Sequence, residues 1–124
     1  MTVPRITKED LKQRLDGPPE ARPVIVDARL KYPYEHSTLT LPGALRMGVG
    51  AADVAHLPRD RDIVVYDSDP HELVSVRVAF DLIRQGFRAA ALTGGIADWI
   101  AAKLPTDSKT APQAAPPAPG ALKG

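Results

Sequence analysis

The stretch that decides the fold runs from Ile63 to Gly86 and reads IVVYDSDPHELVSVRVAFDLIRQG. Residues 63–66 form a short continuous apolar run, which is typical of a strand buried on both faces of a sheet. Apolar side chains then recur at spacings of three and four between Glu72 and Gln85, as in an amphipathic helix. Gly86 stands where a helix is expected to end. The stretch therefore predicts a buried strand, a loop and a helix.

The same alternation continues on both sides of this stretch. A second buried strand is predicted where Pro23 introduces Val24-Ile25-Val26 and Asp27 ends the run, and a weaker apolar segment covers residues 89–92. Further helices are expected from a capped start at Thr7 through Leu15, over Ala51–Leu57 before Pro58, and over Gly95–Lys103 with Trp99 as a core residue. Buried strands that alternate with helices predict an α/β fold, in which helices flank both faces of a mostly parallel central sheet.

The composition sets the domain organisation. With 124 residues, of which 44% are hydrophobic, the chain has the length of one domain. We expect residues 1–104 to form that domain. Residues 105–124 contain five prolines, five alanines and no aromatic residue, so they are predicted to form a disordered tail or linker. A short polyproline ligand is the alternative for Pro116-Pro117-Ala118-Pro119, although this segment lacks flanking basic residues.

Charge and residue usage exclude several functions. Sixteen basic and fifteen acidic residues leave a net charge of +1, which argues against a dedicated nucleic-acid binder. No apolar run approaches the length of a membrane span, and the first residues lack the apolar core of a signal peptide, so a cytoplasmic location is expected. The chain contains no cysteine, so disulfides, thiolate metal sites and cysteine nucleophiles are impossible in it.

Two of the predicted strands end in aspartate, at Asp27 and Asp67. In open α/β sheets, ligands bind outside the carboxyl ends of the strands. The loop after the second strand, Asp67-Ser68-Asp69-Pro70-His71-Glu72, leads directly into the predicted helix, whose amino end could cradle an anion. Three acidic side chains among these six residues disfavour an anionic ligand in the same space.

The sequence resembles the rhodanese domain family over about residues 5–105. The resemblance rests on five motifs in the family's order and spacing, with Thr40 in place of the usual histidine before the Pro-Gly-Ala turn: Val24-Ile25-Val26-Asp27-Ala28-Arg29, Leu41-Pro42-Gly43-Ala44, Ile63-Val64-Val65-Tyr66, Gly86-Phe87 and Leu92-Thr93-Gly94-Gly95-Ile96-Ala97-Asp98-Trp99. It implies a rhodanese-like three-layer fold and sulfurtransferase-like chemistry.

In active members of that family, a cysteine begins the loop and carries sulfane sulfur as a persulfide. Here that position is Asp67, and the loop resembles a longer subtype in which Asp67 and Asp69 stand where two cysteines would lie. Four residues still match that subtype, namely Pro70, Glu72, Ser75 and Arg77. A carboxylate cannot carry sulfane sulfur, so persulfide transfer by this chain is chemically excluded and no catalytic residue is assigned.

Asp67 has one structural and two enzymatic interpretations. In the favoured structural one, it caps the loop amides and the start of the following helix. The run of an apolar strand and Asp-x-Asp also resembles haloacid-dehalogenase-type phosphatases, which use an aspartate nucleophile and Mg²⁺. A third possibility is a phosphoacceptor like that of a response-regulator receiver. Both enzymatic interpretations lack the later lysine and the further acidic residues that those classes need.

Other polar residues near the loop also allow two interpretations. Asp67, Asp69, His71 and Glu72 could bind a divalent cation, but their spacing fits no known metal motif and a solvated loop is favoured. Arg29 and Arg77 are expected to line the pocket together with Asp27. They would either recognise an anion or, as we favour, pair with Asp27, Asp67 or Glu72.

The sequence thus predicts a catalytically inactive rhodanese-like domain that needs no cofactor or metal. Its expected role is protein binding or regulation, through the surface formed by Asp67 to Glu72 and with a partner that is unknown. Two alternatives remain open. One is a metal- or phosphate-dependent activity centred on Asp67 and Asp69, and the other is a structural role beside an active sulfurtransferase.

Overall fold

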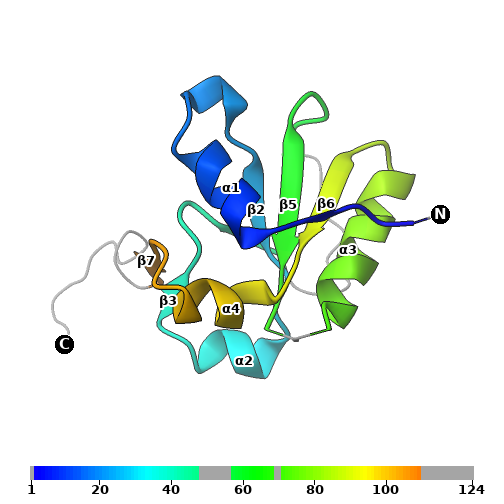
Figure 1. The fold of residues 1–124 in the computed structure, drawn as a ribbon. Coiled ribbons are helices and arrows are strands. Elements are labelled where there is room, and N and C mark those ends of the chain that lie inside the picture. Colours follow the sequence, from blue (N-terminus) through cyan, green and yellow to red (C-terminus); the bar gives the residue numbers. More distant parts are fainter. Residues whose placement is uncertain (1, 48–56, 69–70, 110–124) are drawn as a thin grey trace, which may run out of the picture.

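The computed structural model describes residues 2–47, 57–68 and 71–109. Its central sheet has five strands in the order β1-β6-β5-β2-β4, and every neighbouring pair is parallel (Figure 1). The strands span Arg5–Ile6 (β1), Val24–Asp27 (β2), Leu45–Arg46 (β4), Asp62–Tyr66 (β5) and Arg88–Leu92 (β6). The prediction of a mostly parallel α/β sheet is confirmed.

Helices cover both faces of this sheet (Figure 1). They are α1 (Lys8–Leu15), α2 (Lys31–Glu35), α3 (Leu73–Arg84) and α4 (Gly95–Ala101), with a 3₁₀ turn over Pro19–Ala21. Helix α1 begins as expected, because the side chain of Thr7 accepts a hydrogen bond from the backbone N–H of Asp10 at 3.1 Å. None of the helices in the described part of the chain is long and apolar enough to cross a membrane.

Strand β5 divides the core between the two faces. Its side chains alternate in direction, as in any strand. Ile63 and Val65 pack with buried apolar residues of α3, which are Val78, Ala79 and Leu82. Val64 and Tyr66 belong to the other cluster, which contains Leu11 of α1 and the fully buried Trp99 of α4. The sheet is therefore the middle of three layers, and its carboxyl ends lie between the starts of helices on both sides.

The chain remains ordered beyond the predicted domain boundary at residue 104. Strand β7 (Asp107–Ser108) pairs antiparallel with β3 (Leu39–Thr40), and the backbone N–H of Lys109 donates to Thr38 O at 2.8 Å. The indole Nε1 of Trp99 donates to Pro105 O at 2.7 Å. Residues 105–109 thus have long-range partners that their composition did not indicate, and the domain boundary at residue 104 stays a prediction. The rest of the predicted tail, residues 110–124, lies outside the described residues.

Other differences concern short elements. Helix α2 and strands β1, β3 and β4 were not expected from the sequence, and the last helix ends at Ala101 rather than Lys103. The predicted helix over residues 51–57 lies outside the described residues, except for Leu57, which is buried.

Candidate functional site

Asp27 and Asp67 lie at the carboxyl ends of neighbouring strands. Strands β2 and β5 pair with Asp27 opposite Tyr66, so Asp67 is the first residue beyond the paired region. Both carboxylates are almost completely buried, with 1% of each residue exposed. The structure thus places the two aspartates at the same edge of the sheet, as the sequence predicted, but in two different networks.

The Asp67 carboxylate lies against the first turn of α3. Its Oδ2 atom accepts a hydrogen bond from the backbone N–H of Ser75 at 2.5 Å. This N–H belongs to the third residue of the helix, whose N-cap residue Glu72 makes no side-chain capping bond. The backbone oxygen of Asp67 also accepts from the N–H of Ile96 in α4 at 3.0 Å. These contacts support the structural interpretation, in which Asp67 caps the helix and fixes the loop.

Glu72 turns away from Asp67 toward the N-terminal segment and α4. Its backbone has a positive φ of 57°, which is uncommon for a residue other than glycine. One carboxylate oxygen pairs with Arg5 Nε at 2.9 Å, and the other accepts from the backbone N–H of Gly94 at 3.1 Å. Glu72 therefore ties β1, the start of α3 and the start of α4 together.

The remaining predicted site residues that the structure describes differ in exposure. Ser68 is half-buried and His71 is exposed, while Asp69 and Pro70 lie outside the described residues. Arg77 is exposed on α3, and no ion pair links it to Asp27, Asp67 or Glu72. Within residues 2–47, 57–68 and 71–109, no three histidine or acidic side chains are grouped to hold a metal ion.

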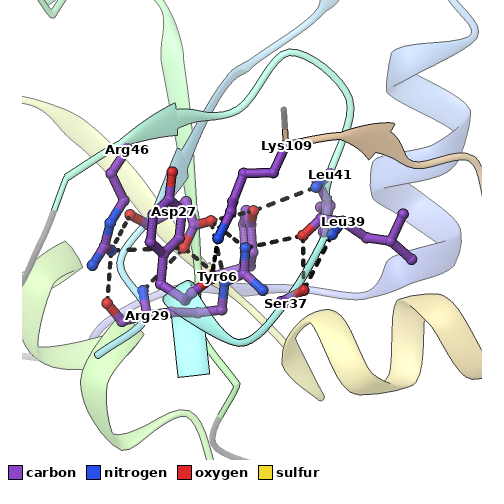
Figure 2. A network of polar contacts seen from close by, with 9 residues as sticks. Asp27, Arg29, Ser37, Leu39, Leu41, Arg46, Tyr66 and Lys109 are labelled. Carbon is purple, nitrogen blue, oxygen red and sulfur yellow. Dashed lines mark hydrogen bonds and ion pairs between the residues drawn. The ribbon is translucent and has the colours of Figure 1, made fainter. Parts of the chain in front are cut away.

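Asp27 forms a buried ion pair with Arg29 (Figure 2). The guanidinium contacts both carboxylate oxygens, with Nε 3.0 Å from Oδ1 and Nη2 2.7 Å from Oδ2. The backbone N–H of Arg29 adds a bond to Oδ1 at 3.1 Å, and the hydroxyl of Tyr66 donates to Oδ2 at 2.8 Å. The favoured pairing of Arg29 with Asp27 is therefore present, and it satisfies both oxygens of the buried acid.

This buried pair also holds neighbouring loops. Arg29 Nη2 donates to Leu39 O at 3.0 Å, and Tyr66 Oη accepts from the backbone N–H of Leu41 at 3.3 Å. Burial alone would lower the pKa of Arg29, but the hydrogen bonds and charge of Asp27 outweigh burial and raise it. Burial, followed by the charge of Asp27, raises the pKa of Tyr66. The raised pKa values keep Arg29 charged and Tyr66 neutral in this network.

Sequence reasoning missed the aromatic and basic residues around this pair. Arg46 Nη1 donates to Arg29 O at 2.6 Å and to Asp27 O at 3.2 Å, and its guanidinium lies 4.1 Å from the ring centroid of Tyr34. Lys109 Nζ lies 4.1 Å from the same centroid and donates to Tyr34 O. The position of Tyr66 at the end of a buried strand was a usable signal for its role. The sequence carried no comparable signal for Arg46 or Lys109.

Comparison with known proteins assigns the chain to a family. Residues 7–102 match the Rhodanese-like domain family. No curated protein matches the chain. Solved structures that share the fold include a full-length protein from Lactobacillus plantarum, with a TM-score of 0.75 and 22% identity over 84% of this chain and 87% of that one.

Two further solved structures are of rhodanese-related or rhodanese-like proteins. A rhodanese-related protein from Thermoplasma volcanium has a TM-score of 0.66 and 18% identity, over 84% of this chain and 97% of that chain. A rhodanese-like domain protein from Staphylococcus aureus has the same TM-score and 21% identity, over 78% of this chain and 91% of that chain. At these identities the likeness establishes the fold.

Proposed function

The chain belongs to the rhodanese-like domain family, and from that premise we propose that it is a non-catalytic member whose role is to bind a protein partner. The observation that carries the proposal is the position of Asp67. The resemblance places the sulfur-carrying cysteine of active members at this residue, and the chain has no cysteine with which to replace it. Sulfane-sulfur transfer through a cysteine persulfide is therefore not available to this chain.

The contacts of Asp67 support a structural role for the residue. A helix amino end attracts anions because its first N–H groups lack partners within the helix. Here the buried carboxylate of Asp67 accepts a hydrogen bond from one of these N–H groups, that of Ser75. A substrate anion would have to displace this carboxylate and would meet its negative charge. The arrangement thus favours a closed, inactive form of the family's site.

Exposed apolar side chains at the same end of the sheet support a binding role. Leu30 and Tyr32, which follow β2, are 50% and 71% exposed. Leu73, the first residue of α3, is 67% exposed. Strands β2 and β5 are parallel neighbours, so the segments that follow them leave the sheet at one end (Figure 1). Aromatic and aliphatic side chains are the usual anchors of protein interfaces, and we assign Leu30, Tyr32 and Leu73 to the binding surface beside the loop from Asp67 to Glu72.

A sulfurtransferase assay with thiosulfate and cyanide tests the catalytic half of the proposal. We expect no protein-dependent turnover from the wild-type chain. Asp67→Cys restores the missing nucleophile, and Asp67→Asn is the matched control that changes the same position without adding sulfur. Turnover by the wild-type chain would refute the proposal. Turnover by Asp67→Cys alone would show that replacement of the nucleophile silenced the site.

Paired surface substitutions test the binding half. A partner captured by the wild-type chain should be lost from a Tyr32→Ser/Leu73→Ser variant, and it should be retained by Ile100→Ser. Ile100 is the control because it is an exposed apolar residue, 40% exposed, on α4. Equal capture by all three proteins would contradict the assignment of this surface, provided that circular dichroism shows each variant to be folded.

A further inference from the structure

A second concave site lies at the carboxyl ends of β2 and β4, beside the β3–β7 pair. It is a cavity of about 170 Å³. It is separate from the contact between Asp67 and α3, since none of the described residues in the range 67–75 lines it. The lining residues are Asp27, Tyr34, Thr40, Gly43, Ala44, Arg46, Asp107, Ser108 and Lys109.

Three cations lie against the ring of Tyr34, which lines this cavity. Arg46 and Lys109 each lie 4.1 Å from the ring centroid, and the Arg29 guanidinium lies 5.3 Å from it. The ring stabilises these charges through its electron-rich faces, but it supplies no negative charge. Three positive groups gathered around a neutral side chain need counter-charge from elsewhere.

The two acidic residues that line the cavity supply less negative charge than the three cations require. The Asp27 carboxylate is engaged by Arg29 and Tyr66, and Arg46 Nη1 lies 3.9 Å from its Oδ1 atom. Asp107 is exposed, and its Oδ2 accepts from the backbone N–H of Gly43 at 2.9 Å. Together with Arg29, which lies against the ring but does not line the cavity, these groups carry three positive and two negative charges, so one positive charge is in excess. In the described part of the chain, Lys109 forms no ion pair.

The cavity also contains hydrogen-bond donors that no described residue uses. Arg46 uses Nη1 for two backbone oxygens, and no hydrogen bond to a described residue uses its Nε or Nη2. A guanidinium with free donors, an ammonium group and a hydroxyl such as that of Thr40 are groups that bind phosphate and sulfate in proteins. A cavity of 170 Å³ accommodates a tetrahedral oxyanion together with a few waters, since one water occupies about 30 Å³ in the liquid.

We propose that this cavity binds a tetrahedral oxyanion of the phosphate or sulfate class, either free or as the terminal group of a small molecule. Arg46 and Lys109 would supply the charge. The inference does not depend on the role of Asp67 or on a protein partner, because it rests on different residues.

The test is titration of the full chain with inorganic phosphate, sulfate and phenyl phosphate, each against chloride at constant ionic strength. Binding is followed by calorimetry and by the NMR signals of Tyr34 and the arginine Nε–H groups. We expect saturable shifts at Tyr34 and Arg46. Saturation by phenyl phosphate alone would assign the site to a phosphoryl group on a small molecule. Absence of saturation with all three anions would overturn the proposal.

Charge variants locate the binding. Lys109→Gln should weaken anion binding about tenfold, the effect of losing one charged hydrogen-bond donor. Arg46→Lys keeps the charge but removes the second donor, and it should weaken binding by a smaller factor. Arg84→Gln removes one positive charge from an exposed position on α3 and should leave affinity unchanged. Equal weakening by Arg84→Gln and Lys109→Gln would indicate general charge screening, and the proposal would then be wrong.

Discussion

The Asp67 carboxylate accepts a hydrogen bond at 2.5 Å from the backbone N–H of Ser75, eight residues later in the chain. It therefore performs the task of a helix cap from outside the helix, while the local N-cap residue, Glu72, has a left-handed backbone and makes no side-chain capping bond. This hydrogen bond joins the residue after β5 to the first turn of α3.

Removal of this carboxylate should destabilise the domain. We expect Asp67→Ala to lower the free energy of unfolding by about 1–2 kcal/mol, because a buried N–H loses its partner. Asp67→Asn keeps an acceptor oxygen but loses the charge, so it should cost less than Asp67→Ala. Urea denaturation measures both values. A stability of Asp67→Ala equal to that of the wild type would contradict the capping role.

The buried pair of Asp27 and Arg29 should respond more strongly to truncation. Arg29→Ala leaves the buried carboxylate with hydrogen bonds from the Tyr66 hydroxyl and a backbone N–H and with Arg46 Nη1 at 3.9 Å, and we expect a loss of about 3–5 kcal/mol. Arg5→Ala is the comparison, because Arg5 pairs with Glu72 while nearly half of its side chain is exposed, and it should cost at most about 1 kcal/mol. Similar losses in the two variants, measured by urea denaturation, would show that burial does not set the strength of the Arg29 pair.

The strands and helices predicted correctly are those with strong periodicity. Strands β2 and β5 and helix α3 each follow from their own residues, because burial on both faces or on one helical face leaves a readable pattern. Helix α2 has five residues, KYPYE, with a proline inside and no buried residue, so it has no such pattern. Strands β1, β3, β4 and β7 have two residues each and exist through partners far away in the chain.

The same distinction applies to the candidate site. Asp27 and Asp67 could be placed from the strands that precede them, because parallel strands end at one edge of a sheet. Their partners could not all be placed. Ser75 lies on the predicted helix, but the contact of Tyr66 with Asp27 spans 39 residues, and that of Lys109 with Tyr34 spans 75. Such contacts depend on how loops pack, which local patterns do not specify.

Gly95 permits the close approach of α4 to Asp67. Its φ is +62°, and an added Cβ would lie 2.4 Å from the backbone oxygen of Asp67. Gly43 has a similar φ of +68°, but an added Cβ would meet nothing within 4 Å. We expect Gly43→Ala to cost about 1 kcal/mol for the left-handed backbone alone. Gly95→Ala should cost about 2–4 kcal/mol, because it adds displacement of a buried loop. Thermal and urea denaturation of the two variants separate the cost of the left-handed backbone from the cost of displacing the loop. Equal losses of stability in the two variants would show that the loop moves freely.

Tyr66 should make stability fall at alkaline pH. Burial and the neighbouring Asp27 raise its pKa in the folded chain, whereas an unfolded tyrosine titrates near about 10. Below this pH both states keep the phenolic proton, so the contribution of Tyr66 is fully present. Above it the unfolded chain releases the proton and the folded chain retains it. The free energy of unfolding should then decrease by about 1.4 kcal/mol per pH unit for this group.

Tyr66→Phe isolates the effect, because it cannot titrate. At pH 7 the variant should be less stable than the wild type by about 1–2 kcal/mol, since the hydrogen bond to Asp27 is lost. This difference should shrink as the pH rises above about 10, where only the wild type loses stability through this residue. Tyr32→Phe is the matched control, because Tyr32 is an exposed tyrosine, and its curve should follow the wild type. A constant gap between Tyr66→Phe and the wild type from pH 7 to pH 11 would show that the phenol titrates equally in both states.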